Sequence, residues 1–207
     1  MPSPDAARTL EMLERNQARI RDLIDSVLTA ERKKAEPICA RPRDVTLGEL
    51  LQQGLDTAER EAASKGLQIE TSYHGSLGLH VDPDLTTSIF TNLIENAVKY
   101  TEFGTVSISV EERAHEVALH VRDNCEGISD AELAVVFEPF RRGATDHEGF
   151  GLGLSIAKRA AEAQGGTLEA ESPGDRGCHF WVTLPRRVES PSMESGEEDH
   201  GAHPDRQ

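Results

Sequence analysis

Residues 91–104, TNLIENAVKYTEFG, are the stretch from which the rest of the chain can be interpreted. Asn92 and Asn96 lie one helical turn apart and share a polar face with Lys99 and Tyr100. Carboxamide oxygens can ligate a hard cation, and a lysine can neutralise phosphate. Taken alone, the pattern also fits an ordinary amphipathic helix. The apolar residues recur at helical spacing and predict one buried face: Leu93, Ile94, Ala97 and Val98.

Composition restricts the class of protein. The chain has 207 residues, enough for one good-sized domain with an extra element or for two small domains. Its formal net charge of −15 argues against nucleic acid or an anionic membrane as a partner. We find neither a membrane-spanning apolar run nor a signal-peptide pattern, so we expect a cytoplasmic protein. Cys39, Cys125 and Cys178 are far apart in the sequence, which fits a reducing compartment and predicts no cysteine-based zinc site.

Residues 4–36 predict one long helix whose apolar residues repeat every three or four positions, as in a coiled coil or a helix bundle. A single helix cannot bury such a stripe alone. It can pack on the following domain, but we favour self-association, or pairing with a partner helix, through residues 8–30. We therefore expect a partial dimerisation element at 1–36, a catalytic domain at 37–188 and a disordered acidic tail at 189–207. The seam of the helix contains Leu10, Leu13, Gln17, Ile20, Ile24 and Val27.

Strand and helix patterns alternate through the middle of the chain and predict an α/β domain. Gly66 is expected to end the first of these helices, while Asp82 and Pro83 are expected to begin the second. His120 and His179 are expected at surface or edge positions. Helices are predicted at 47–65, 82–100 and 154–164 with a short one after Ser129, and strands at 44–46, 67–73, 78–81, 105–112, 116–122, 167–172 and 179–184.

Two polar stretches outside the first helix face could bind a ligand. Asp123 follows a predicted strand, where its carboxylate can accept the exocyclic amino group of adenine or simply cap a turn. Gly149, Gly151 and Gly153 precede a helix whose N-terminal N–H groups and dipole favour phosphate. Such a glycine run can also serve the fold alone.

The order of these stretches resembles the motif order of sensor histidine kinases. Residues 92–101 (NLIENAVKYT) resemble the N box, 123–128 (DNCEGI) the first glycine box, and 137–140 (FEPF) the F box. Residues 149–155 (GFGLGLS) are similar to the second glycine box, and 177–185 (GCHFWVTLP) to the closing strand. The long N-terminal helix resembles the second helix of that family's dimerisation domain, so the resemblance covers nearly everything except the tail.

The resemblance implies the two-layer α/β sandwich of the GHKL (Bergerat) superfamily of gyrase, Hsp90, histidine kinase and MutL. This fold has a mixed sheet with helices on one face, preceded here by one long bundle helix. The implied cofactors are ATP and Mg²⁺, with Asn96 as metal ligand and residues 141–148 as a lid anchored by Phe137 and Phe140. Asn92, Asn96 and Lys99 are implied to be catalytic. The residues implied to line the nucleotide site are Asn92, Asn96, Lys99, Tyr100, Asp123, Gly127, Ile128, Phe140, Gly149, Gly151, Leu152, Gly153 and Leu154.

Three features bear on the chemistry: the residue one turn before Asn96, the residue at position 125, and the His-Glu pairs. ATPase members of the superfamily place a glutamate one turn before the metal asparagine, but here that position is Asn92, and Glu95 is expected to point elsewhere. Cys125 replaces the initial glycine of the first glycine box and would be strained at a positive φ. The pairs at 115–116 and 147–148 have the His-Glu sequence of an acceptor box, but neither lies on a predicted bundle helix.

Three functions fit these features. The first is the ATP-binding catalytic part of a histidine kinase, which phosphorylates a histidine that the chain does not supply and acts with a response regulator. The second is a degenerate regulatory module that binds nucleotide weakly or not at all and docks or dimerises through its N-terminal helix. The third is a serine kinase of the anti-sigma-factor type, against which the bundle helix and the N box argue.

Overall fold

The computed structural model describes residues 38–141, 151–173 and 176–186. The long helix expected near the N-terminus and the expected tail lie outside these residues, so both stay predictions. The elements in chain order are β1 (Arg43–Thr46), α2 (Leu47–Lys65), β2 (Gln68–Ser72), β3 (Gly78–Val81), α3 (Pro83–Tyr100), β4 (Thr105–Glu112), β5 (Glu116–Arg122), α4 (Asp130–Leu133), α5 (Gly153–Glu162), β6 (Thr167–Glu171) and β7 (His179–Pro185).

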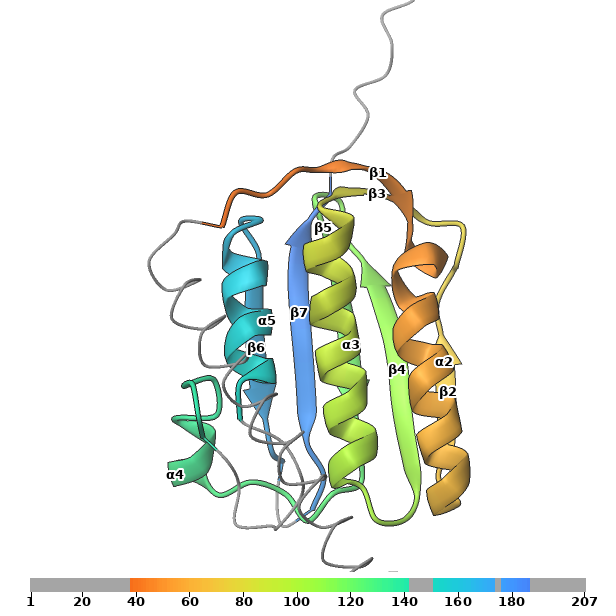
Figure 1. Ribbon diagram of the computed structural model, residues 1–207, viewed down its shortest axis with the longest axis vertical. Coiled ribbons are helices and arrows are strands. Elements are labelled where there is room, and N and C mark those ends of the chain that lie inside the picture. The colour runs from red at the N-terminus through yellow and green to blue at the C-terminus, as the bar shows by residue number, and fades with distance from the viewer. Residues whose placement is uncertain (1–37, 142–150, 174–175, 187–207) are drawn as a thin grey trace, which may run out of the picture.

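Within the described residues, five strands form the main sheet in the order β2-β4-β5-β7-β6. The pairing of β2 with β4 is parallel and the other pairings are antiparallel, so the sheet is mixed. Helices α2, α3 and α5 lie side by side on one face of this sheet, with α3 in the middle (Figure 1). Strands β1 and β3 form a separate antiparallel ribbon at one end. The expected two-layer sandwich with helices on one face is therefore confirmed.

The core lies between the two layers. Helix α3 contributes Ile89, Leu93, Ile94 and Val98, all buried, to the side that faces the sheet. The inward residues of the strands alternate with outward ones, as a period of two requires. Burying one such aliphatic side chain is worth about 1.5–3 kcal/mol, so this face fixes the rotation of α3 about its axis. The strand residues that complete this part of the core are Val106, Ile108, Leu119, Val121, Phe180, Val182 and Leu184.

The end of α2 and the start of α3 lie at the residues that the sequence indicated, whereas the cap at the start of α2 was not predicted. Thr46 and Glu49 form a reciprocal capping box at the start of α2, and Gly66 ends that helix in the left-handed conformation. Asp82 accepts a hydrogen bond from the N–H of Leu85 at 3.0 Å, with Pro83 as the first residue of α3. The start of α3, and hence the position of its polar face, is therefore fixed by local chemistry.

One detail of the expected fold was wrong. His179 is buried and His120 is half-buried, whereas both were expected at surface or edge positions. They lie on β7 and β5, each of which has a neighbouring strand on both sides. Adjacent side chains from those neighbours cover them, which alternation within a single strand does not reveal.

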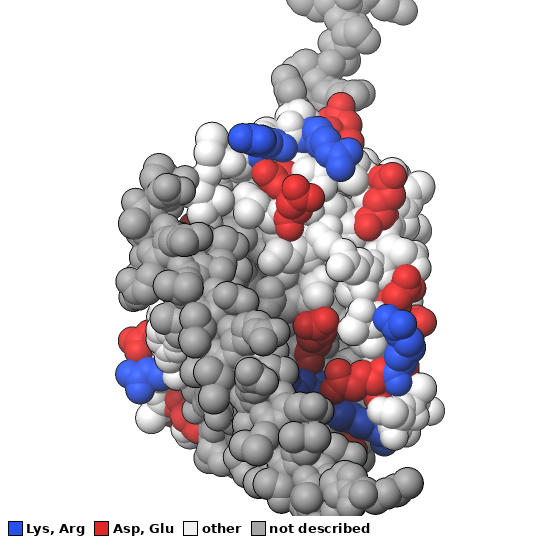
Figure 2. Space-filling model, in the orientation of Figure 1, with Lys and Arg blue, Asp and Glu red and all other residues white. Residues whose placement is uncertain are grey.

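Acidic and basic side chains are interspersed over the α2 side of the helical face (Figure 2). Lys65, for example, lies 3.0 Å from Glu61 one turn earlier. Mixed charge of this kind is typical of a solvated helix surface. None of the helices in the described part of the chain is long and apolar enough to cross a membrane.

Candidate functional site

Most of the residues singled out in the sequence meet at one end of the sandwich. Figure 1 shows that α3 finishes there, that the loop after β5 begins there, and that α5 starts there. Helices α3 and α5 pack against one another, and the loop after β5 is tied to β7 by the hydrogen bond from the N–H of Asp123 to the carbonyl of Cys178, at 3.0 Å. Three segments far apart in the sequence thus converge. The exceptions are Gly149 and most of the expected lid, which lie outside the described residues.

The first contact between these segments joins α3 to the start of α5. A Cβ atom added at Gly153 would collide with the Oδ1 atom of Asn92. The Asn92 carboxamide is held in place because its Nδ2 donates to the carbonyl of Ser88 at 2.7 Å. Glycine is therefore required at position 153 for the asparagine side chain to reach the N-terminus of α5, where backbone N–H groups lack helical acceptors.

Asn96 and Lys99 continue the same face of α3 by one further turn. The Asn96 side chain is half-buried, and within the described part of the chain its carboxamide makes no hydrogen bond. Lys99 lies with its Nζ 5.2 Å from the centre of the Tyr100 ring. A carboxamide oxygen and an ammonium group on one helix face offer a ligand for a hard cation and a counter-charge for an anion.

Glu95 is adjacent to Asn96 but faces α2. Burial raises the pKa of the Glu95 carboxyl, and repulsion from Glu61 on α2 raises it further. The carboxylate is therefore directed at the neighbouring helix, as the sequence predicted. At the position one turn before Asn96 stands Asn92, whose amide cannot accept a proton as a general base.

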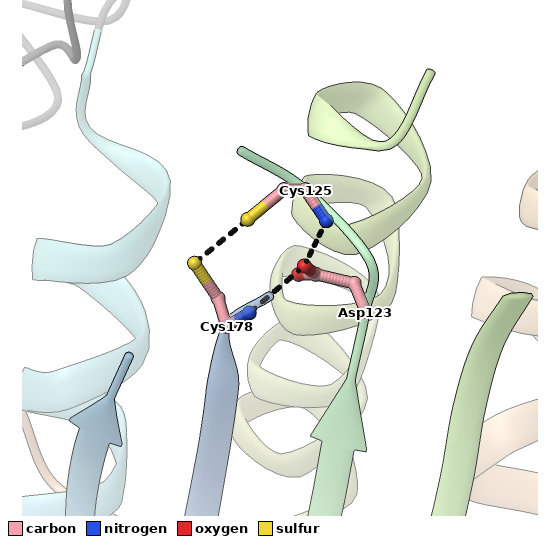
Figure 3. Close-up of side chains that lie close together, drawn as sticks. All are labelled: Asp123, Cys125 and Cys178. Carbon is pink, nitrogen blue, oxygen red and sulfur yellow. Dashed lines mark hydrogen bonds between the residues drawn. The ribbon is translucent and has the colours of Figure 1, made fainter. Parts of the chain in front are cut away.

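Asp123 is a buried carboxylate with a fixed orientation. Its Oδ1 accepts hydrogen bonds from the N–H of Cys125 at 2.9 Å and from the N–H of Cys178 at 3.1 Å (Figure 3). Burial raises the pKa of Asp123, while the hydrogen bonds from Cys125 and Cys178 oppose the rise. Backbone donors from two segments hold the group, so the carboxylate is ready to accept a further donor without reorganising.

Cys125 carries no backbone strain. Among the described residues Phe140 alone has a positive φ without being glycine, at 63°, and Cys125 is not in that region. The strain that a non-glycine residue was expected to cause in this loop is therefore absent. Ile128, a few residues on, is anchored by a hydrogen bond from its N–H to the Oγ of Ser172 at 3.0 Å.

The two flanks of residues 142–150 are joined. The N–H of Phe140 donates to the carbonyl of Gly151 at 2.9 Å. Gly151 has φ 67°, and a Cβ there would collide with the carbonyl of Arg141, so glycine is required for both reasons. Phe137 packs edge-on against Phe180 at a centroid distance of 6.4 Å and so anchors this segment to the core.

Leu152 and Leu154 anchor the start of α5 through apolar contacts. Leu152 is buried, and Leu154 is partly buried against the core. Phe140, by contrast, is 46% exposed, so its side chain is not anchored in the core as that of Phe137 is. The expected lining residues therefore divide into polar groups that can meet a ligand and apolar groups that hold the segments together.

One neighbourhood was missed by the sequence reasoning. Asp123, Cys125 and Cys178 are buried, and one potential ligand atom from each lies within 4.8 Å of the others. The cysteines are far apart in the sequence, but separation along the sequence does not determine distance in the fold. The available signal was that Asp123 follows β5 and Cys178 precedes β7, so antiparallel pairing of these strands brings both to the same edge.

Comparison with known proteins identifies the family. Residues 81–188, more than half of the chain, match the family model of histidine kinase-, DNA gyrase B-, and HSP90-like ATPases. The chain belongs to this family. Curated relatives in it include the signal transduction histidine-protein kinase BarA of Escherichia coli and the adaptive-response sensory kinase SasA of Synechococcus elongatus. SasA is 34% identical over 177 residues, which cover 83% of this chain and 46% of the relative.

Solved structures of histidine kinases share the fold. Full-length ShkA in complex with AMPPNP superposes with a TM-score of 0.77 at 25% identity, over 92% of this chain and 41% of that one. The mycobacterial sensor histidine kinase MprB gives a TM-score of 0.63 at 25% identity, over 70% of this chain and 99% of that one. The chain therefore contains an ATP-binding catalytic module of the histidine kinase type. It spans about half the length, or less, of the curated relatives it matches.

Proposed function

We propose that this module binds Mg-ATP and transfers the γ-phosphoryl group to a histidine on a helix that the described residues do not supply. The observation that carries the proposal is the approach of Asn92 to Gly153 at the N-terminus of α5, with Asn96 one turn further along α3. That arrangement sets oxygen ligands beside backbone N–H donors, the combination that a metal-bound triphosphate requires.

Each residue has a role that follows from its chemistry. Asp123 accepts the exocyclic amino group of adenine, because its carboxylate is buried and held by two backbone donors. Lys99 neutralises phosphate charge, with Tyr100 beside it. Gly151 and Gly153 let the backbone approach the phosphates closely, with Gly149 proposed to do the same. Gly127 and Ile128 shape the loop next to the base.

Asn96 is the proposed ligand of Mg²⁺, supported by Asn92. A carboxamide oxygen suits a hard cation that keeps several of its waters, and the Asn96 carboxamide is not engaged by the described residues. When bound, the ion would neutralise charge on the phosphates. The protein's own contribution is to position the nucleotide and to exclude a general base, because Asn92 cannot activate water. This is why we propose transfer rather than hydrolysis.

A regulatory module that binds nucleotide weakly or not at all is the alternative. It was favoured by Cys125 in the glycine box, but the backbone angle there removes the expected strain. As a kinase, the chain would act with a second protein: a partner that carries the acceptor histidine, and a response regulator. Its curated relatives are sensory kinases, and we propose that it acts in the cytoplasm as a homodimer or with a partner helix.

Titration calorimetry tests the nucleotide site. Wild-type protein should bind Mg-ATP and prefer it to Mg-GTP, because guanine has a carbonyl oxygen where adenine has the amino group that Asp123 accepts. Asp123→Ala should remove this preference, and Asn96→Ala should weaken binding with magnesium present. Gln53→Ala, an exposed amide on α2, is the matched control and should leave both affinities unchanged. Equal binding of both nucleotides by the wild type would refute the role of Asp123, and no binding of Mg-ATP would refute the function.

Incubation with labelled ATP tests the transfer. The chain alone should form no stable phosphohistidine, whereas a kinase dimerisation domain that supplies an acceptor helix should become labelled in its presence. An acid-labile, alkali-stable product on this chain would show that it carries its own acceptor. Mapping that product to His115 or His147 would identify which His-Glu pair is the acceptor.

A further inference from the structure

Cys125 and Cys178 are 53 residues apart in the sequence, yet their Sγ atoms are 2.8 Å apart (Figure 3). Both are buried free thiols. They are held face to face by the backbone, since the N–H of Gly177 donates to the carbonyl of Cys125 at 2.8 Å. The N–H groups of both cysteines also converge on Oδ1 of Asp123, at 2.9 and 3.1 Å. The pair is therefore built into the same unit as the proposed adenine acceptor.

We propose that Cys125 and Cys178 form a reversible disulfide on exposure to a small peroxide, and that the bond weakens nucleotide binding at Asp123. The second half of this proposal rests on the proposed function. The first half does not, because it concerns the two thiols alone. Their contact is close to a bonded arrangement already, since an S–S bond of about 2.05 Å requires the sulfurs to approach by less than 1 Å.

The reaction balances with one peroxide for each bond. One cysteine, as the thiolate, attacks a peroxide oxygen; the O–O bond breaks, and the departing hydroxide takes up a proton to become water. The resulting sulfenic acid is then attacked by the second sulfur. An S–S bond forms, the S–O bond breaks, and a second water leaves with the remaining thiol proton. Two thiols are oxidised by two electrons, and hydrogen peroxide is reduced to two waters.

The surroundings of the pair set its rate. A hydrogen bond with Cys178 and burial raise the pKa of the Cys125 thiol well above its ordinary range. Thiolate is therefore scarce at neutral pH, and oxidation should be slow compared with that of an exposed low-pKa cysteine. Burial also favours a small oxidant over a bulky disulfide. The pair consequently responds to sustained peroxide and not to brief exposure.

Oxidation would reach Asp123 by two routes. Drawing the sulfurs together moves Cys125 and Cys178, whose N–H groups are the two donors on Oδ1. It also removes the hydrogen bond from the Cys125 thiol. That bond lowers the pKa of Asp123 and so offsets part of the larger rise that burial causes. Losing this donor leaves the carboxylate less stable as an anion and therefore a poorer acceptor for adenine. We expect ATP affinity to fall about threefold to tenfold, as the loss of a weak hydrogen bond to a charged group implies.

A metal ion on the same three residues fits less well. Two thiolates on one tetrahedral zinc ion, each about 2.3 Å from the metal, would lie about 3.8 Å apart. The sulfurs would therefore have to separate by about 1 Å from their present contact. The observed contact of 2.8 Å therefore favours bond formation between the sulfurs over a shared metal.

The test uses the full chain with Cys39→Ser, because Cys39 is exposed and could bridge two molecules. After treatment with hydrogen peroxide, intact mass and peptide mapping should show one intramolecular bond between Cys125 and Cys178, reversed by dithiothreitol. Cys178→Ser and, as a second replacement that stays apolar, Cys178→Ala should form no such bond. Titration with Mg-ATP should show weaker binding by the oxidised protein, and no change on peroxide treatment of either Cys178 variant.

The outcomes separate the two proposals. Absence of the bond after prolonged oxidation of folded protein would overturn the redox pair, whatever the nucleotide affinity. A bond that leaves ATP affinity unchanged would overturn its effect on Asp123. A metal site would replace the redox pair if three results came together. Zinc would stabilise the reduced protein, Cys178→Ser would lose this stabilisation, and peroxide would produce no disulfide. Failure of the reduced protein to bind ATP would instead refute the proposed function while leaving the disulfide measurable.

Discussion

At the scale of single residues, the site depends on the absence of a Cβ atom at Gly153. The position is occupied by glycine because Asn92 Oδ1 takes the space where a Cβ would lie. The same close approach brings α3 to the end of α5 that is proposed to bind phosphate. A one-carbon change at this point therefore affects packing and the proposed nucleotide site together.

Gly153→Ala should destabilise the protein by about 1–3 kcal/mol, the usual range for overpacking, and weaken Mg-ATP binding. Asn92 must move to admit the methyl group, and it cannot do so while its Nδ2 stays bonded to Ser88. Chemical denaturation and calorimetry measure the two effects. Gly78→Ala is the control, because a Cβ there meets nothing within 4 Å. Equal stability of the two variants would show that the contact at Gly153 is not rigid.

At the scale of elements, the position of α3 is determined at its N-cap residue. Asp82 is buried and accepts two backbone hydrogen bonds, from Leu85 at 3.0 Å and from Arg41 at 2.7 Å. Its own N–H donates to the Gln164 side chain at 2.9 Å, which ties α3 to the segment after α5. This cap therefore aligns the two helices that carry the asparagines and the glycine run.

Asp82→Ala should lower the free energy of unfolding by about 1–3 kcal/mol, because a helix cap is lost and buried N–H groups are left without an acceptor. Asp84→Ala removes an exposed carboxylate two residues later and should change stability by less than about 1 kcal/mol, since only its interaction with the helix dipole is lost. Urea titrations of both variants give the comparison. A loss at Asp84 as large as at Asp82 would mean that charge, not capping, holds the helix start.

His120 on β5 makes stability depend on pH. His120 Nδ1 lies 3.0 Å from His179 Nε2, on the sheet face opposite the helices. Burial lowers the pKa of His120, with repulsion from His179 and Arg122 adding to it and Glu111 opposing it. The far side of His179 contacts Glu171, at 2.8 Å.

Because the pKa of His120 is lower in the folded state, the unfolded chain binds its proton more readily. The stability contributed by neutral, buried His120 is fully present above the unfolded histidine pKa of about 6.5. It is lost as the pH falls from there through the lower pKa of the folded state. Urea midpoints from pH 7.5 to 5.5 should therefore fall, and His120→Asn should flatten the slope. His74→Asn, which changes an exposed histidine before β3, is the control. An unchanged slope in His120→Asn would assign the pH dependence to other groups.

Local signals predicted the elements well because their causes are local. Asp82 with Pro83 marks the start of α3, and Gly66 marks the end of α2, through hydrogen bonds made within a few residues. Strand pairing has no such signal: β2 pairs with β4 in parallel, and not with β3, which follows it in the chain. The same limit explains why the contact between Cys125 and Cys178 and the burial of His179 were missed. Both depend on which strands become neighbours of β7.

The candidate site was more predictable than the sheet. The asparagines, Asp123 and the glycine run were identified from residue type and order, and the structure brings the described ones to one end of the sandwich. The φ angle of Cys125 could not be predicted from the sequence. A cysteine at a glycine position of the motif predicted backbone strain, but Cys125 does not have a positive φ.

At the scale of the whole molecule, the net charge of −15 and the apolar seam expected near the N-terminus predict opposite behaviour in solution. Charge repulsion favours monomers, while each buried leucine or isoleucine of a helix seam is worth about 1.5–3 kcal/mol. Several such residues between 8 and 30 outweigh repulsion spread over a large surface, which salt also screens. We therefore expect self-association that persists at low salt.

The chain should sediment as a dimer, and Ile20→Asp with Ile24→Asp should yield a monomer whose ATP affinity is little changed. The affinity should hold because the proposed nucleotide site is built entirely from residues beyond Pro42, in a domain with its own core. Ala18→Asp with Ser26→Asp adds the same two charges off the seam and should leave the dimer intact. Analytical ultracentrifugation across a wide concentration range measures all three. A wild-type chain that stays monomeric at high concentration would mean that the stripe packs on its own domain, and the acceptor histidine would then have to reach the site without a dimer.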